Sequence, residues 1–526
     1  MSDLTRRDFL KKTSLASFLA LSPASEELLK LSKRFPKSSK GIIFLVGDGW
    51  PLGVMKAYME YARRVFKIEP NLSKLLQDSR TRVSLSVTNS LSSVVTDSAP
   101  ASVAWATGSK TANRLLASLP DGKKLKTIAE LAKDKGMGLG FVTTTRITHA
   151  TPAGWYSHHL NRDAEDEVAL DLLALKPDVA MGGGLRHFLS DKRIDKRDLI
   201  AKFRGAGYQV VQTREELKKA SLSRPVLGLF ADSHLSFYID RINDRELSTI
   251  QPTLPEMTAV ALSILGENPK GFVLQIEAGR IDHACHNNDV AGALYDTYEM
   301  DMTLGVVLSF LEINPHVLLI VTSDHGNSMF GINGTGPEYN HSTEALLKYQ
   351  KAKASFEYIK AKMRGKSPQE IQSIMAEFTG FSDITVDEAQ EIHHRLNNPP
   401  LILENDFWYE PEATMGRILS KSRYRTIGQG KRGTLPEKME ALVRRGNIYF
   451  TGTNHTAEDQ LLVVRSQTPI KNLPARSDNT YVFKLMCDYL NIRYENPKMT
   501  EEEYIAKYTV TIKAEEWEKH LALHVS

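Results

Sequence analysis

The chain has few cysteines and no strong excess of either charge, and each scarcity excludes a class of protein. Its 526 residues include two cysteines, Cys285 and Cys487, which allow at most one disulfide bond and exclude a disulfide-based scaffold. Lysine and arginine number 67 against 63 aspartate and glutamate residues, so the formal net charge is only +4. That excess does not predict nucleic acid as a specific partner. No stretch is apolar for long enough to predict an integral membrane span in the mature chain.

The first thirty residues have the pattern of a targeting segment. In TRRDFLKKTSLASFLALSPAS, the pair Arg6 and Arg7 precedes a modest apolar run that ends at Leu21. The pattern resembles a twin-arginine signal peptide over residues 1–30, which an export receptor reads. It predicts a partner in the twin-arginine export machinery and a periplasmic or secreted location. A basic amphipathic N-terminal helix is the alternative.

Apolar runs that recur along the chain predict buried strands. The first, GIIFLVGDG, ends in Gly-Asp-Gly, and similar runs follow at LGFVTTT, PDVAMGGG, YQVVQ, PVLGLFA, GFVLQIEAG and HVLLIVTSDHGN. Such runs are typical of strands buried on both faces of a parallel sheet. Helical patterns such as LKTIAELAKDKG lie between them. We therefore predict an α/β fold, a three-layer sandwich with a central, mostly parallel sheet and a helical insertion.

The predicted core is interrupted once. Its first part covers residues 40–327, and strand patterns return in its final part at 446–490. The segment between them, 328–445, is charged and helical and then loop-like and basic. We interpret this segment as an insertion that serves as a lid or an oligomer contact. The tail, residues 491–526, has no predicted role.

Acidic and histidine residues gather at the predicted strand ends, where the chemistry of such sheets collects. Asp282 and His286 in EAGRIDHACH are four residues apart, so one helical turn would place them on one face. Mixed carboxylate and imidazole ligands suit Zn²⁺, whereas an all-oxygen site suits Mg²⁺. Each such residue alone is as easily a turn former or a packed side chain, but their coincidence predicts a metal centre. The candidate ligands are Asp48, Glu277, Asp282, His286, Asp324, His325 and His455.

The stretch VVTDSAPASVAWATG allows three interpretations of Ser98. It could cap the following helix, because serine is a common N-cap residue. It could belong to a sulfatase modification motif, but that motif needs an arginine where this chain has Ser102. It could also be a nucleophile at a helix N-terminus, a position that favours phosphate binding.

The ordered set of motifs resembles the alkaline phosphatase family over most of residues 40–490. The set comprises Gly-Asp-Gly, Thr-Asp-Ser-Ala, TTTRITHATPAGWYSHHLNR, EAGRIDHACH, TSDHGN and NHTAED. The resemblance implies hydrolysis of small phosphate monoesters through a phosphoserine at Ser98. It also implies that Asp97 orients Arg162, which clamps the phosphate. Relatives are often homodimers, so a second copy of the chain is a candidate partner.

The resemblance further implies two zinc ions and one magnesium-type ion. One zinc ion would be held by Asp282, His286 and His455. The second would be held by Asp48, Asp324 and His325. The third ion would be held by Asp48, Thr151 and Glu277. Two metal ions about 4 Å apart can stabilise both the attacking and the leaving oxygen of an in-line displacement.

Three residues depart from patterns found in the family. His149 stands where many bacterial relatives have aspartate, which opens the identity of the third ion, and His283 stands where some have lysine. Both are candidates for a supporting role behind the ligands. Cys285 stands where relatives usually have a small residue, and we interpret it as a buried filler. The alternatives to a phosphomonoesterase are a phosphodiesterase or sulfatase of the same superfamily, or a non-catalytic exported protein that binds phosphate or metal.

Overall fold

The computed structural model describes residues 35–38, 40–334, 336–398, 410–420, 447–468, 470 and 473–508. The predicted signal peptide, the basic end of the predicted insertion from residue 421 on, and the end of the tail lie outside these residues. In the described part of the chain, no helix is long and apolar enough to cross a bilayer.

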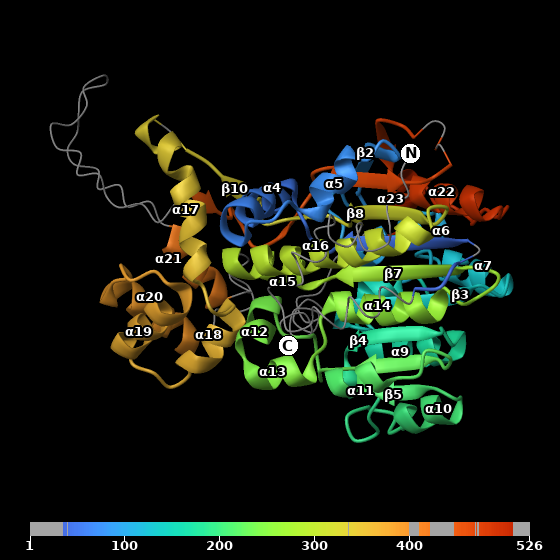
Figure 1. The fold of residues 1–526 in the computed structure, drawn as a ribbon, viewed down its shortest axis with the longest axis horizontal. Coiled ribbons are helices and arrows are strands. Elements are labelled where there is room, and N and C mark those ends of the chain that lie inside the picture. The colour runs from blue at the N-terminus through green and yellow to red at the C-terminus, as the bar shows by residue number, and fades with distance from the viewer. Residues whose placement is uncertain are drawn as a thin grey trace, which may run out of the picture.

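A single large sheet forms the centre of the molecule (Figure 1). Its ten strands follow the order β14-β2-β13-β8-β1-β7-β3-β4-β6-β5, and all pairs are parallel except those of β13 with β2 and β8. The strands are β1 (Gly41–Gly47), β2 (Thr81–Val87), β3 (Gly138–Arg146), β4 (Val179–Gly183), β5 (Gln209–Val211), β6 (Val226–Leu229), β7 (Phe272–Ala278), β8 (Leu318–Ser323), β13 (Gln460–Arg465) and β14 (Arg476–Asp478). The predicted α/β class with a mostly parallel sheet is confirmed.

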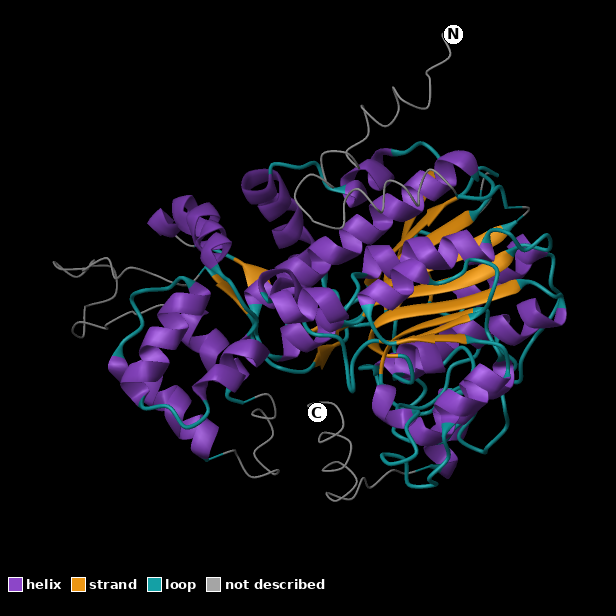
Figure 2. Cartoon of the chain, turned by 60° about the horizontal axis from the view of Figure 1, so that its bottom comes forward, coloured by secondary structure: helices purple, strands orange, loops and turns teal. Residues whose placement is uncertain are grey.

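Helices cover both faces of this sheet (Figure 2). In β1, Ile43 and Leu45 belong to one hydrophobic core, whereas Ile42, Phe44 and Val46 belong to the other. Because every residue of β1 is buried, the strand needs apolar side chains on both faces. The first core is covered by helices α4 (Leu52–Tyr61), α5 (Asn71–Gln77), α12 (Tyr238–Asn243), α14 (Leu254–Leu265) and α16 (Val290–Ile313). The second is covered by α6 (Ser98–Thr107), α7 (Ile128–Asp134), α9 (Glu165–Leu175), α10 (Leu199–Gly205) and α22 (Tyr481–Leu490).

The chain leaves and re-enters the core through two short antiparallel pairings, which we call the stem. Strand β9 (Gly326–Asn327) pairs with β12 (His455–Thr456), and β10 (Gly331–Ile332) pairs with β11 (Ile448–Tyr449). Beyond the stem lies a group of helices set apart from the sheet (Figure 1). They are α17 (Ser342–Lys348), α18 (Phe356–Met363), α19 (Pro368–Thr379), α20 (Val386–Asn397) and α21 (Glu412–Ser420). The role predicted for this segment, as a lid or an oligomer contact, stays a prediction.

Two buried carboxylates of the core hold the start of α18. Asp240 accepts hydrogen bonds from the backbone N–H of Ser355 at 2.7 Å and from its hydroxyl at 2.6 Å. Asp289 accepts from the N–H of Phe356 at 2.8 Å. Burial raises the pKa of Asp240 to about 7, and the nearby charges of Glu357 and Asp289 add to the rise. The inserted helices are therefore attached to the core by groups that titrate near neutral pH.

Asp240→Asn should stabilise the protein increasingly as pH rises. The folded pKa of Asp240 lies above its unfolded value, so the wild type loses stability between about pH 4 and pH 7, where the folded carboxyl resists ionisation. The amide keeps the shape of the neutral acid and does not ionise. We expect the stability of the variant relative to wild type to rise by on the order of 2–3 kcal/mol between pH 5 and pH 8. Urea unfolding at both pH values measures this, with Asp191→Asn at an exposed site as the matched control; a pH-independent difference would contradict it.

Arg241 and Glu299 form an ion pair that is buried between α12 and α16. Each side chain is 1% exposed, and Arg241 also donates to the carbonyl oxygens of Ser236 and Pro252, both at 2.9 Å. Glu299 in turn accepts from the N–H of Leu254 at 2.8 Å. With its remaining polar atoms satisfied in this way, the pair joins α12, α14 and α16.

Arg241→Met should destabilise the protein by about 3–5 kcal/mol, because Glu299 would keep a buried charge without its partner. Lys484→Met is the control, because it breaks the exposed Lys484–Asp488 pair and should leave the free energy of unfolding nearly unchanged. Urea unfolding measures both variants. If both variants lost the same free energy of unfolding, burial would not explain the strength of the Arg241–Glu299 pair.

Candidate metal centre and nucleophile

Three neighbouring strands deliver carboxylates to one edge of the sheet. Strand β1 lies between β7 and β8, and Val46 is level with Glu277 on one side and Thr322 on the other. Asp48 directly follows β1, Asp324 directly follows β8, and Glu277 lies near the end of β7. The three side chains are each 0% exposed. Parallel pairing therefore brings together carboxylates that are far apart in the sequence.

Helix α15 (Arg280–His286) adds two more candidate ligands, as the spacing predicted. Oδ2 of Asp282 lies 3.2 Å from Nε2 of His286, one helical turn later. Asn327 of the stem donates to Oδ1 of Asp282 at 2.6 Å. Gly49 lies close to the same carboxylate, since a Cβ atom there would be 2.3 Å from Oδ1 of Asp282, and its φ of +52° favours glycine. The second glycine of Gly-Asp-Gly thus makes room for a ligand.

Backbone carbonyls orient the histidines of the site. Nδ1 of His286 lies 2.5 Å from the carbonyl oxygen of Thr453, and Nδ1 of His455 lies 3.0 Å from that of Thr96. Nδ1 of His325 lies 3.2 Å from the carbonyl oxygen of its neighbour Gly326. A carbonyl oxygen only accepts hydrogen bonds, so each Nδ1 carries the proton. Each Nε2 then keeps a lone pair, which is the state of a metal ligand.

These lone pairs face each other across a small space. Nε2 of His286 lies 3.1 Å from Nε2 of His455, and Nε2 of His325 lies 3.2 Å from Oδ2 of Asp324. Oδ2 of Asp324 accepts no hydrogen bond from the described residues. Facing acceptor atoms repel one another unless a cation lies between them. The residues present therefore fit bound metal ions.

The titration of the site agrees with that fit. Burial raises the pKa of Asp48 well above its usual range, and the charges of Asp324, Asp282 and Glu277 raise it further. Burial also raises the pKa of Asp324 to about 7. Burial lowers the pKa of His455 to about 4, which keeps its imidazole neutral. A cation would stabilise the ionised carboxylates, and neutral imidazoles are ready to bind it.

Three sets of ligand atoms each lie within 4.8 Å of one another. The sets are Asp282 with His325 and His455, Asp48 with Asp324 and His325, and Asp48 with His149 and Glu277. The second set consists of the three residues predicted for the second zinc ion. The first set has His325 in place of the predicted His286, whose Nε2 lies 3.2 Å from Oδ2 of Asp282. The imidazole and carboxylate donors suit Zn²⁺.

The third set contains Asp48 and Glu277, two of the three residues predicted for the third ion, together with His149. Nδ1 of His149 lies 3.9 Å from Oε1 of Glu277. The third predicted residue, Thr151, lies on the short helix α8 (Ala150–Ala153) and donates its hydroxyl to Oδ2 of Asp48 at 3.2 Å. Thr151 thus stays a predicted ligand beside this set. Oxygen ligands alone suit Mg²⁺, whereas His149 as a ligand would move the site away from the surroundings that Mg²⁺ prefers.

Ser98 lies beside these sets as the first residue of α6. The residue that caps the helix is Asp97, whose side chain accepts from the N–H of Ala99 at 2.7 Å, so the interpretation of Ser98 as the cap was wrong. The hydroxyl oxygen of Ser98 lies 3.3 Å from Nε2 of His325 and 3.5 Å from Oδ1 of Asp48. Its hydroxyl thus points toward the predicted metal ligands.

Arg162 is buried next to this serine and held from two sides. Its Nη1 donates to Oδ1 of Asp97 at 3.1 Å, and its Nη2 lies 3.0 Å from Nε2 of His149. Asp97 also accepts from the backbone N–H of Arg114 at 2.7 Å. Asp97 therefore caps the helix of Ser98 and orients the guanidinium at once.

Sequence reasoning missed the groups that support the ligands. Thr145 donates to Oε2 of Glu277 at 2.9 Å, and Thr143 contacts the same oxygen. The buried ring of His283 lies behind the site. Its centroid is 4.4 Å from that of His234 and 6.1 Å from that of His149, and both ring pairs are tilted. The run of threonines at the end of β3 was the one visible signal. Cys285 is buried, as predicted, and burial raises the pKa of its thiol.

Comparisons with known proteins identify the family. The alkaline phosphatase family model matches residues 39–492. Alkaline phosphatase 4 of Bacillus subtilis (strain 168) is 32% identical over 361 residues, which cover 67% of this chain and 74% of that protein. Streptomycin-6-phosphate phosphatase of Streptomyces griseus is 32% identical over 339 residues, which cover 56% of this chain and 75% of that protein.

Solved structures show the same likeness in three dimensions. The crystal structure of Thermus thermophilus alkaline phosphatase has a TM-score of 0.79 and 33% identity, covering 93% of this chain and 98% of that one. The alkaline phosphatase of a psychrophilic Shewanella species has a TM-score of 0.67 and 27% identity, and the match covers 86% of this chain and 99% of that one. The chain therefore belongs to the alkaline phosphatase family, whose members hydrolyse phosphate monoesters with bound metal ions.

Proposed function

We propose that Ser98 is the nucleophile of this phosphomonoesterase and that hydrolysis passes through a phosphoserine. The Oγ of Ser98 forms a bond to phosphorus while the bond from phosphorus to the ester oxygen breaks. Water then attacks the phosphoserine, which releases inorganic phosphate and restores the hydroxyl. The observation that carries the proposal is the contact of Oγ with both Nε2 of His325 and Oδ1 of Asp48.

The proposal includes two zinc ions and a third ion. We assign one zinc ion to Asp282, His286 and His455 and the other to Asp48, Asp324 and His325. The third ion, of magnesium type, belongs to Asp48 and Glu277 with Thr151. When bound, the ions lower the pKa of the serine hydroxyl and stabilise the negative charge on the attacking and leaving oxygens. The neutral histidines and buried carboxylates bind them without further rearrangement of protons on the imidazoles.

Arg162 binds the transferred phosphoryl group in this mechanism. A guanidinium offers two parallel N–H groups to the non-bridging oxygens, which a lysine could not match. Asp97 fixes its orientation through the 3.1 Å hydrogen bond. Ser98 stands at the N-terminus of a ten-residue helix, whose dipole favours an anion at that end. Both effects concentrate positive potential where the phosphate must lie.

The surroundings of Ser98 do not favour a sulfatase. The hydroxyl of Ser102, in the place of the motif's arginine, donates to the carbonyl oxygen of Thr151 at 2.6 Å and is 0% exposed. It packs α6 against α8. Ser98 therefore acts unmodified in our proposal.

Ser98→Ala should lower turnover of 4-nitrophenyl phosphate by at least about 10³-fold, because the covalent step loses its nucleophile. Its zinc content should match the wild type, since the serine is not among the assigned ligands. Metal analysis of the assayed sample checks this, and Ser92→Ala, on a nearby loop, is the control. Full activity in Ser98→Ala would exclude the nucleophile assignment.

A chelator should abolish activity, and zinc should restore it. The zinc affinity of the metal-free protein should rise as pH increases through about 7, because the carboxyl of Asp324, with its pKa raised to about 7, must be ionised to bind a cation. The wild type should prefer 4-nitrophenyl phosphate to bis(4-nitrophenyl) phosphate and 4-nitrophenyl sulfate. Rates from about pH 6 to 10 with metal analysis of each sample test this. Diester or sulfate preference would contradict the monoesterase, and full activity without metal would contradict the ion sites.

We also propose, on the sequence of residues 1–30, that the chain is exported by the twin-arginine machinery to the periplasm or the medium. A homodimer stays a prediction drawn from the family resemblance. Neither proposal depends on the geometry of the metal centre.

A further inference from the structure

A pocket with three lysines lies at the edge of the sheet opposite the metal centre. The metal centre lies at the carboxyl ends of β1, β7 and β8, whereas the pocket lies at the amino ends of β1, β7 and β3. Because β1 is seven residues long, the two sites are about 20 Å apart. The pocket is thus separate from the phosphatase site.

The backbone holds the three lysines in neighbouring positions. Lys40 precedes β1, Lys270 precedes β7 and Lys135 precedes β3. The carbonyl oxygen of Lys40 accepts from the N–H of Phe272 at 3.1 Å, and that of Gly271 accepts from Gly138 at 2.9 Å. Pairing of the central strands therefore brings the three side chains to one rim.

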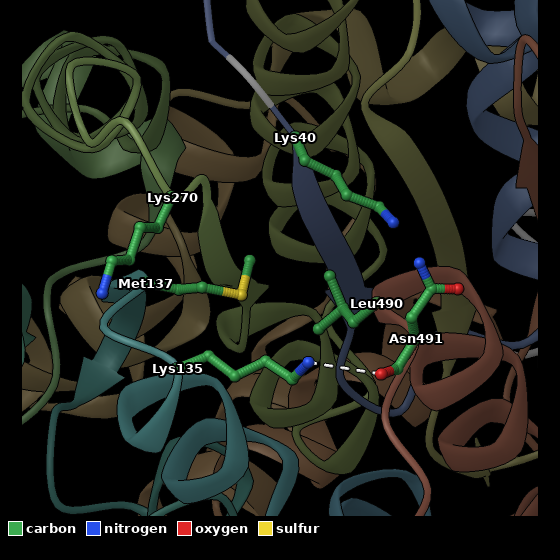
Figure 3. A pocket seen from close by; sticks show the side chains of 6 residues that line it. All are labelled: Lys40, Lys135, Met137, Lys270, Leu490 and Asn491. Atoms are coloured by element: carbon green, nitrogen blue, oxygen red, sulfur yellow. Dashed lines mark hydrogen bonds between the residues drawn. The ribbon is translucent and has the colours of Figure 1, made fainter.

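The pocket has a volume of about 400 Å³ and a mixed lining. Figure 3 shows the three lysines arranged around it, with Met137 and Leu490 between them and Asn491 at one side. Met137 is 7% exposed and Leu490 is 5% exposed, so they form an apolar base. A volume of this size suits a small molecule, since ligand sites commonly measure about 300–1,000 Å³.

The positive charge of this pocket is not balanced by its neighbours. Within the described parts of the chain, none of its three lysines forms an ion pair with a carboxylate. The adjacent carboxylates have other partners, because Asp134 pairs with Lys126 at 2.8 Å and Asp488 pairs with Lys484 at 3.0 Å. Two of the lysine ammonium groups have weaker contacts instead.

Those contacts hold the ammonium groups without neutralising them. Lys135 donates to the carbonyl oxygen of Asn491 at 3.2 Å, and Lys40 lies over the ring of Tyr489, 4.8 Å from its centroid. Burial lowers the pKa of Lys40, and the charge of Lys135 lowers it further. Lys40 and Lys135 therefore repel one another, and a bound anion would remove this cost.

We propose that this pocket binds a small multivalent oxyanion, a molecule with phosphate or sulfate groups around a compact apolar body. The lysines supply several point charges, which suit oxyanions at more than one position. Met137 and Leu490 supply the surface for the apolar part. This site does not depend on the proposed phosphoserine mechanism, because it shares no residue with the metal centre.

The test titrates the metal-loaded protein with pyrene-1,3,6,8-tetrasulfonate, a fluorescent polyanion with an apolar body, at constant ionic strength. Binding is followed by fluorescence polarisation. We expect the double variant Lys135→Gln/Lys270→Gln to weaken binding at least about tenfold, because two of the three charges are lost. The matched control is Lys202→Gln/Lys219→Gln, which removes two exposed lysines elsewhere and should bind as the wild type does.

Two further measurements distinguish the outcomes. The kcat/KM for 4-nitrophenyl phosphate should be the same in both double variants and in the wild type, which places the loss of binding away from the metal centre and shows that the variants fold. Inorganic phosphate and inorganic sulfate are then compared as competitors at matched ionic strength, and displacement by either supports the site and identifies its anion. Equal dye affinity in all three proteins, or displacement by sodium chloride as effective as by both oxyanions, would overturn the proposal.

Discussion

Repulsion among buried carboxylates is the constraint around which the functional edge of the sheet is built. Asp48, Glu277 and Asp324 come from three adjacent parallel strands, with no exposed surface between them. The parallel pairing of β1 with β7 and β8 fixes the positions of these three carboxylates, so they cannot move apart. Cations are the partners that make such an arrangement stable, so the central strands and the metal ions depend on each other. Burial keeps the surrounding histidines neutral, because it lowers the pKa of His455 more than the charge of Asp282 raises it.

The outer layer of the site then fixes what each ligand can do. Carbonyl oxygens of Thr96, Gly326 and Thr453 select one tautomer for each of three histidines. Asp97 performs a comparable task next to Ser98, where it both caps the N-terminus of α6 and orients Arg162. The chemistry of the centre thus relies on main-chain atoms from the loop before α6 and from the stem. Their positions depend on the fold as a whole.

Much of this centre could be predicted because its signals are local. The strands β1, β7 and β8 are buried on both faces and so form uniform apolar runs that end at acidic residues, and Asp282 and His286 are one helical turn apart. Other features leave no such signal. Strand β2 lies near the sheet edge, with Val83 49% exposed, and its mixed pattern does not resemble a buried strand. The carbonyl that orients a histidine is chemically the same at every residue, and Asp240 meets Ser355 only after the chain has folded.

The stem is a point at which sequence can be added to the chain with little effect on the site at the sheet edge. Its β9–β12 pairing places Asn327 opposite His455, so the position of this candidate ligand is set at the base of the inserted segment. The length and content of the intervening helices can change in evolution while the ligand keeps its position, because the closing geometry is set at the base of the excursion. A laboratory could use the same junction to exchange these helices for those of another member of the family. The inserted helices can therefore change independently of the sheet edge that holds the candidate ligands.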